Sequence, residues 1–283
     1  MYSRNRKRDF LNRLAPYGLK SVHSNEAFRI PVNDQFVFVK VYGPKKPRFS
    51  YEIRNMLDWI GIRQPIEYLA PQKRKDWEEY YLRHWREKGF LVPVVLASPF
   101  PEYKEIPHLS TKFVEGTTLK VVLKQGYVSS RDVLGNFFEE ISKRHQQALR
   151  TQDHYLFHVD ANTQNILLVE NQFYHVDFEM GRPWEKPRES ACRELSKLLI
   201  SIGEDVEPEE RNFVYALFKK CYGNSDLLDR LDRSVNGRPF QKLHRWRNEK
   251  KKRINPRCVT LYDLVDSLRN IRGNFSGAPM DKD

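Results

Sequence analysis

The chain has 283 residues, of which 40% are hydrophobic and 13% aromatic. This length and apolar content suffice for one large or two small packed domains, and they exclude a globally disordered protein. Basic residues outnumber acidic ones by 49 to 37, giving a formal net charge of +12. The three cysteines are too few and too far apart for a disulfide framework or a zinc knuckle, which favours a reducing compartment.

The positive charge is concentrated in two segments. Residues 1–14 contain five basic residues and one acidic residue, and residues 242–253 contain seven and one. These segments predict attraction to a polyanionic surface (anionic lipid, nucleic acid or an anionic substrate), although a solvated helix face that binds nothing is the alternative. No run approaches the ~18 apolar residues of a membrane span, and the basic N-terminus lacks the apolar run of a signal peptide, so we expect a cytosolic protein.

The first predicted element is a strand over residues 36–42 (Phe-Val-Phe-Val-Lys-Val-Tyr), which is rich in β-branched and aromatic side chains. Lys40 has apolar neighbours on both sides. A lysine in such a strand usually points to solvent, but one strand lysine of a kinase-like sheet reaches the α- and β-phosphates of ATP. The motif farther along the chain favours this second role for Lys40.

Helical periodicity predicts two helices next, over residues 49–60 and 73–88. Glu78 shares a face of the second helix with Leu82 and Trp85, so its carboxylate is placed to pair with the strand lysine. The alternative is a glutamate that only stabilises the helix N-terminus.

Apolar runs over residues 91–97 and 108–114 predict two further strands, followed by a connector at 115–118. In a nucleotide-binding cleft, backbone groups here would meet the adenine edge. The residues proposed for this contact are Phe113, Val114 and Glu115. Periodicity predicts further helices over residues 130–149, 189–202 and 211–222.

Residues 158–165 (His-Val-Asp-Ala-Asn-Thr-Gln-Asn) place Asp160 five residues before Asn165. Two short apolar runs, predicted as a hairpin with its turn at 170–171, then lead to Asp177 of an Asp-Phe-Glu sequence. In phosphoryl transfer from Mg-ATP, one carboxylate orients the attacking hydroxyl, while an amide and a second carboxylate hold the metal. Each residue alone is more typical of a turn or cap, but the joint pattern indicates kinase chemistry.

On these motifs the chain resembles the protein-kinase-like superfamily, and within it is most similar to the bacterial lipopolysaccharide core kinases, which phosphorylate 3-deoxy-D-manno-octulosonic acid or heptose sugars. The resemblance covers about residues 35–200. The segments that carry it are Phe38–Tyr42, Trp77–Pro93, Phe113–Gly116, His158–Leu167 and Val176–Arg182. It implies a two-lobed α+β fold, with a small antiparallel-sheet N-lobe over residues 1–115 and a mainly helical C-lobe over residues 116–283.

The resemblance also implies the roles of the site residues and the cofactors, ATP and Mg²⁺. Asp160 would be the catalytic base. Asn165 and Asp177 would be the magnesium ligands, and Lys40 and Glu78 the pair that anchors the phosphates.

Three departures from the protein-kinase pattern bear on the substrate. No glycine occurs between Gly18 and Gly43, so the glycine-rich phosphate loop is missing, and residues 24–28 are expected to form the corresponding turn. The usual Asp-Phe-Gly reads Asp-Phe-Glu, which sugar and small-molecule kinases of the superfamily tolerate. No Ala-Pro-Glu motif follows, which argues against a protein substrate.

The motifs predict a kinase, and the resemblance implies that it phosphorylates a sugar hydroxyl, in free or lipid-linked form, of the lipopolysaccharide inner core. It would be cytoplasmic and peripheral at the inner face of the inner membrane, drawn to anionic lipid by residues 1–14 and 242–253. An anionic sugar would meet Arg182, Lys186 and Arg188. The alternatives are another small-molecule kinase, of the aminoglycoside or choline type, and a non-catalytic kinase-like scaffold that binds RNA or a partner through its basic segments.

Overall fold

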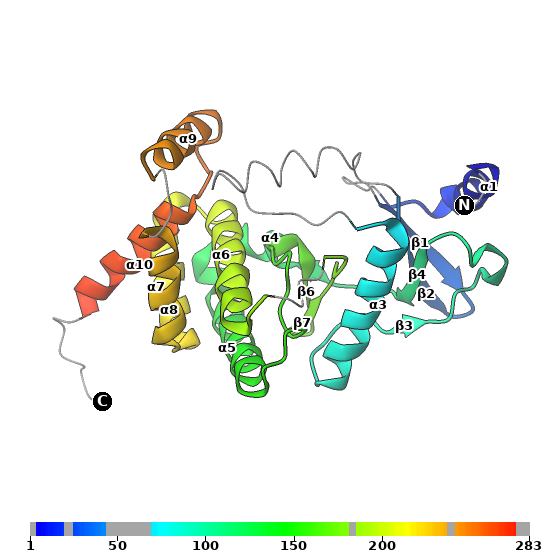
Figure 1. Ribbon diagram of the computed structural model, residues 1–283, viewed down its shortest axis with the longest axis horizontal. Helices are drawn as coiled ribbons and strands as arrows, with labels where there is room; N and C mark the ends of the chain where they lie inside the picture. The colour runs from blue at the N-terminus through cyan, green and yellow to red at the C-terminus, as the bar shows by residue number, and fades with distance from the viewer. Residues whose placement is uncertain (1–3, 20–24, 44–68, 181–184, 237–240, 276–283) are drawn as a thin grey trace. The chain divides into compact units, whose positions relative to one another are not determined.

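The computed structural model describes residues 4–19, 25–43, 69–180, 185–236 and 241–275 (Figure 1). Contacts divide the chain into two compact units. The first comprises residues 1–116 with 174–181, and the second comprises residues 117–173 with 182–283. The helix predicted over residues 49–60, Ser24 and Arg182 lie outside the described residues. The turn predicted over residues 24–28 in place of the glycine-rich loop is wrong where the structure describes it, because Glu26, Ala27 and Phe28 begin a strand (Glu26–Val32).

The first unit contains a small antiparallel sheet, one long helix and an N-terminal helix. In chain order its elements are α1 (Arg4–Leu14), the 3-10 helix η1 (Ala15–Tyr17), β1 (Glu26–Val32), β2 (Gln35–Val41), α3 (Pro71–Glu87), β3 (Val95–Leu96), the 3-10 helix η2 (Pro101–Tyr103) and β4 (His108–Lys112). The sheet has the order β1-β2-β4-β3. The hairpin of β1 and β2 turns at Asn33, whose φ of 52° is a left-handed conformation that asparagine adopts more readily than most residues.

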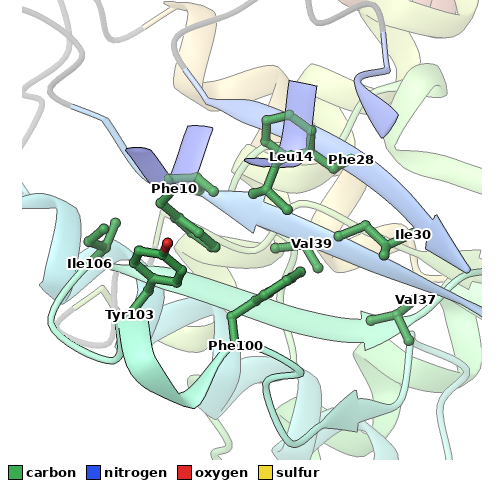
Figure 2. Packing of buried hydrophobic residues seen from close by; sticks show 10 residues of the cluster. Phe10, Leu14, Phe28, Ile30, Val37, Val39, Phe100, Tyr103 and Ile106 are labelled. Carbon is green, nitrogen blue, oxygen red and sulfur yellow. The ribbon is translucent and has the colours of Figure 1, made fainter. Parts of the chain in front are cut away.

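Strand β2 separates an apolar core on one face from the candidate site on the other. Val37, Val39 and Val41 pack into a buried cluster with Phe10 and Leu14 of α1 (Figure 2). The side chains of successive strand residues point to opposite faces of a sheet. The alternate positions of this strand therefore carry Lys40 to the face opposite the cluster.

One strand prediction is wrong over most of its length. Of residues 91–97, only Val95 and Leu96 form a strand, and they pair with β4. Pro93 has no N–H to donate to a neighbouring strand, although the carbonyl of Val94 still accepts a hydrogen bond from the Lys112 N–H at 2.8 Å. The proline therefore delays the start of regular pairing.

The second unit is mainly helical, with a small sheet of order β5-β6-β7. Its elements in chain order are β5 (Thr117–Thr118), α4 (Leu119–Leu123), α5 (Tyr127–Thr151), the 3-10 helix η3 (Thr163–Asn165), β6 (Ile166–Val169), β7 (Gln172–His175, whose last two residues group with the first unit), α6 (Pro187–Asp205), the 3-10 helix η4 (Pro208–Glu210), α7 (Arg211–Tyr222), α8 (Ser225–Asn236), α9 (Gln241–Ile254) and α10 (Leu261–Phe275). Glu170 and Asn171 have φ values of 47° and 65°, so the turn between β6 and β7 is built from two left-handed residues.

Helices α5, α6, α7 and α10 form the core of the second unit. In this core the rings of Phe138 and Phe218 meet edge to face, and their centroids are 5.2 Å apart. Cys192, Cys221 and Cys258 are free thiols. Among the helices that the structure describes, none combines the length and the apolar composition needed to cross a membrane.

Candidate active site

Lys40 lies at the centre of a buried charge cluster in the first unit. Its Nζ donates to Glu78 Oε2 at 2.7 Å and to Asp177 Oδ1, and lies 3.6 Å from Glu179 Oε2. The Lys40 side chain is 10% exposed and that of Glu78 is 7% exposed, so this ion pair is shielded from water. The structure thus brings together three of the predicted site residues, Lys40, Glu78 and Asp177.

Burial and charge act in opposite directions on the groups of this cluster. Burial on its own lowers the pKa of the Lys40 ammonium, but Glu78, Asp177 and Glu179 outweigh it and raise that pKa above the ordinary value of 10.5. Burial raises the pKa of Glu78, and Lys40 opposes this effect. The Tyr42 hydroxyl donates to Glu78 Oε2 at 2.7 Å, which helps to fix the carboxylate beside the lysine.

Arg74 adds a second buried cation, which ties the Asp-Phe-Glu segment to α3. Its guanidinium donates to Glu179, to Asn25 Oδ1 at 2.6 Å and to the Gly43 carbonyl at 2.8 Å. Asn25 Nδ2 in turn donates to Glu179 Oε2 at 2.5 Å. Arg74 and Glu179 together therefore connect α3 to the residue before β1 and to Gly43, which follows β2.

The carboxylates of this cluster have the composition of a divalent-cation site. Glu78, Asp177 and Glu179 each offer an oxygen, and these atoms lie within 4.8 Å of one another. Among the described residues, the cations Lys40 and Arg74 face these three carboxylates. Hard cations such as Mg²⁺ prefer oxygen ligands of this kind, so the residues present fit the predicted metal.

Asp177 adopts a left-handed backbone conformation with a φ of 69°. For a residue other than glycine this costs on the order of 1–2 kcal/mol, although aspartate is among the types that tolerate it. Such conformations persist where the surrounding contacts enforce them, and they are frequent at functional sites. The ion pair with Lys40 is one such contact.

The segment predicted to meet adenine follows β4. The N–H of Phe113 donates to the Phe36 carbonyl at 3.0 Å, so it is committed to the protein backbone. The guanidinium of Arg29 lies 4.6 Å from the Phe113 ring and 3.7 Å from Glu115 Oε1. A nucleotide contact by Phe113, Val114 and Glu115 remains a prediction. It would be made by backbone N–H and C=O groups of this segment other than the Phe113 N–H.

The second unit holds the other two predicted residues, Asp160 and Asn165. The amide nitrogens of Asn162 and Asn165 both donate to the Asp160 carbonyl, each at 3.0 Å. Asn162 Oδ1 accepts from the N–H groups of Gln164 and Asn165 at 3.0 and 3.2 Å, which caps η3. This arrangement fixes the Asn165 amide by its nitrogen, so its oxygen is the end that would ligate a cation.

A buried network anchors the beginning of this loop. Glu194 of α6 accepts from the His158 N–H at 2.9 Å and forms a two-pronged ion pair with Arg144, at 2.5 and 3.1 Å. Arg144 also donates to the Leu156 carbonyl at 2.8 Å. Burial on its own raises the pKa of Glu194, but Arg144 and His145 outweigh it and hold that pKa well below its ordinary value.

Sequence reasoning did not assign a role to four charged residues of these clusters: Arg74, Arg144, Glu179 and Glu194. Two features of the sequence could have indicated Arg74 and Glu194. Arg74 precedes Glu78 by four residues on one helix, so the two share a face. Glu194 lies on the same side of its helix as Ala191, Leu195 and Leu198, and a glutamate on such an apolar side is rarely buried unless it is paired. Lys186, proposed to meet an anionic sugar, is exposed, and Arg188 lies 4.0 Å from Asp226.

Comparisons with known proteins identify the fold. No family model and no curated protein sequence matches this chain. Among solved structures, the chain is similar to one titled "WaaP in complex with acyl carrier protein", with 15% identity and a TM-score of 0.50, over 87% of this chain and 92% of that one. This likeness, with the small antiparallel sheet and the mainly helical second unit, confirms the predicted two-lobed α+β protein-kinase-like fold.

Proposed function

We propose that this protein is an ATP-dependent phosphotransferase that phosphorylates a sugar hydroxyl, with the inner core of lipopolysaccharide as the preferred acceptor class. The observation that carries the proposal is the buried cluster in which Lys40 contacts both Glu78 and Asp177. A strand lysine held by a helix glutamate beside a metal-binding aspartate is the arrangement that phosphoryl transfer uses to bind ATP phosphates. The structural likeness to WaaP supports the kinase-like fold on which this reaction depends, and the acceptor class rests on the sequence resemblance to the lipopolysaccharide core kinases.

Each residue has a part in the proposed reaction. Asp177 and Asn165 would hold Mg²⁺, which when bound neutralises charge on the phosphates. Lys40 contributes a fixed positive charge for the phosphate oxygens, since its raised pKa keeps it protonated. Asp160 would orient the sugar hydroxyl and accept its proton as the hydroxyl oxygen bonds to the γ-phosphorus, while the bond from the γ-phosphorus to the β,γ-bridging oxygen breaks and ADP leaves.

Thermal unfolding with and without Mg-ATP tests this proposal. A ligand at 100 times its Kd stabilises the folded state by about 2.7 kcal/mol. For a chain of this size we expect the unfolding temperature to rise by about 5–10 °C. The rise should require magnesium and should vanish in Asp177→Ala.

An exposed aspartate on α5 provides the matched control, since Asp132→Ala should keep the full response to Mg-ATP. No rise in the wild type at millimolar ATP would contradict the proposal and favour the non-catalytic scaffold. A response to Mg-ATP with turnover only on aminoglycosides or choline would instead assign the chain to another small-molecule kinase.

The basic helix α9 supports a peripheral position on an anionic membrane. One side of α9 contacts α10. The guanidinium carbon of Arg245 lies 4.9 Å from the centre of the Tyr262 ring, and Lys252 Nζ donates to Asp263 Oδ1 at 2.6 Å. Trp246 and Ile254 are 62% and 79% exposed. A helix that presents bulky apolar side chains among lysines and arginines is typical of the membrane interface.

Vesicle binding distinguishes this partner from nucleic acid. We expect the protein to sediment with vesicles that contain anionic lipid, to ignore zwitterionic vesicles, and to lose at least about fivefold in affinity on Trp246→Ala, equivalent to roughly 1 kcal/mol. Phe213 of α7 is the matched control, since it is equally exposed at 62%. Binding to RNA but not to vesicles, or equal losses in Trp246→Ala and Phe213→Ala, would contradict the membrane assignment.

A further inference from the structure

Helix α6 presents a row of polar side chains to the loop that carries Asp160. Glu194, Lys197, Ser201 and Asp205 are spaced by three, four and four residues, which places them along one side of a helix. Each of them bonds a residue between 158 and 163. The loop is therefore aligned along one helix rather than held at a single point.

Two of these contacts hold the far end of the loop. Ser201 Oγ accepts from the Thr163 N–H at 3.2 Å and lies 3.0 Å from the Thr163 hydroxyl. That hydroxyl also donates to Asp205, and Lys120 lies 3.4 Å from the other oxygen of this carboxylate. These bonds involve Thr163 and do not reach the Asp160 carboxylate, which is bonded by another residue of the same helix.

Lys197 is that residue. Its Nζ donates to the Val159 carbonyl at 2.6 Å and to Asp160 Oδ1 at 3.1 Å. One ammonium thus restrains both the backbone before Asp160 and its carboxylate. The side chains of Lys197 and Asp160 are 36% and 44% exposed, so the pair is accessible to a substrate.

The sequence of the loop makes this cation significant. Residues 158–165 contain no lysine and no arginine, so no permanently charged cation belongs to the loop itself. Phosphoryl transfer depends on prearranged positive charge near the transferred group and on close positioning of the attacking hydroxyl. Lys197, which lies 32 residues after Asn165 in the chain, provides a cation beside Asp160 from helix α6.

We infer that Lys197 is a positioning residue for Asp160, which sets the carboxylate in the orientation that receives the acceptor hydroxyl. This inference rests on the proposed phosphotransferase function. A lysine that served only to stabilise the fold would change the unfolding temperature, whereas a positioning lysine changes the rate of the chemical step.

Steady-state kinetics of Lys197→Met test the inference. Methionine keeps the apolar stem and removes the donor. A misplaced catalytic group costs up to about 100-fold, so we expect kcat to fall about 10- to 100-fold while KM for ATP stays within about twofold of wild type. Lys197→Arg should recover most of the loss, since it restores a donor and a charge. Lys220→Met, at an exposed lysine of α7, is the matched control and should behave as wild type.

A double-mutant comparison then separates positioning from general damage. If Lys197 acts through Asp160, Lys197→Met should change kcat little once Asp160 is already asparagine, so the two effects are not additive. Additive losses, or an unchanged kcat in Lys197→Met, would overturn the inference while leaving the kinase proposal intact.

Amide hydrogen exchange provides a readout that needs no turnover. Lys197→Met should speed exchange in residues 158–165 of the full chain, and Lys197→Arg should restore protection. Unchanged exchange in this loop would overturn the restraint itself. A wild type that shows no phosphoryl transfer to any acceptor would refute the proposed function, and the catalytic part of this inference with it.

Discussion

Replacement of Asp160 by asparagine is expected to lower kcat for phosphoryl transfer by about 10²- to 10⁴-fold, the range that a positioned general base contributes. Asparagine keeps the size and shape of the side chain, but it cannot take up the proton of the acceptor hydroxyl. The Asp160 side chain is 44% exposed and its carboxylate has the Lys197 ammonium 3.1 Å away. The unfolding temperature should therefore change little. A coupled assay of ADP formation with a core sugar acceptor measures the effect.

Asp132→Asn, at an exposed position of α5, is the control and should leave kcat unchanged. Binding of Mg-ATP should survive in Asp160→Asn, because the nucleotide is assigned to Lys40 and the metal ligands. Turnover within about threefold of wild type would remove Asp160 from the mechanism, because a base that contributes about 10²-fold or more cannot be lost at so small a cost. Parallel losses of nucleotide binding and turnover would instead indicate a disrupted loop.

The elements that the sequence predicted well are those with a strong local pattern. The helix predicted over residues 211–222 has the bounds of α7, and the hairpin predicted around residues 170–171 turns on two left-handed residues. Periodicity and turn composition are local properties, so a single sequence carries them. The strand predicted over residues 91–97 is limited to Val95 and Leu96 in the structure, because Pro93 precedes the two residues that pair with β4.

The candidate site was predictable only in part, because some of its ion pairs join residues that are far apart in the sequence. The sequence indicated that Lys40 and Glu78 could pair, and the structure places their charged atoms 2.7 Å apart. The pairing of Arg74 with Glu179 joins residues 105 positions apart, and no periodicity reports a contact of that range. In the sequence, Glu179 was noted only as the residue that replaces the usual glycine of Asp-Phe-Gly. This replacement does not indicate which residue the glutamate pairs with. Tertiary packing determines such ion pairs.

Replacement of Glu194 by glutamine is expected to lower the free energy of unfolding by about 3–5 kcal/mol, the cost of leaving one member of a buried ion pair without its partner. Glu194 and Arg144 are 2% and 0% exposed, so water cannot take the place of the lost charge. The amide also pairs less well with the two-pronged guanidinium. Urea unfolding monitored by circular dichroism measures the change, and Glu139→Gln, an exposed position of α5, should alter it by less than about 0.5 kcal/mol.

The same substitution should change how stability depends on pH. The pKa of Glu194 lies well below its ordinary value of 4.5 in the folded state, because Arg144 and His145 outweigh the effect of burial. The unfolded chain therefore binds a proton at Glu194 at a higher pH than the folded chain does. The stability from this ion pair is fully present above about pH 4.5 and is lost as the pH falls below it. Between about pH 4.5 and 3, the unfolding free energy of Glu194→Gln should consequently fall less steeply than that of the wild type. Parallel curves for the two proteins would show that Glu194 titrates alike in both states and that the ion pair adds no stability.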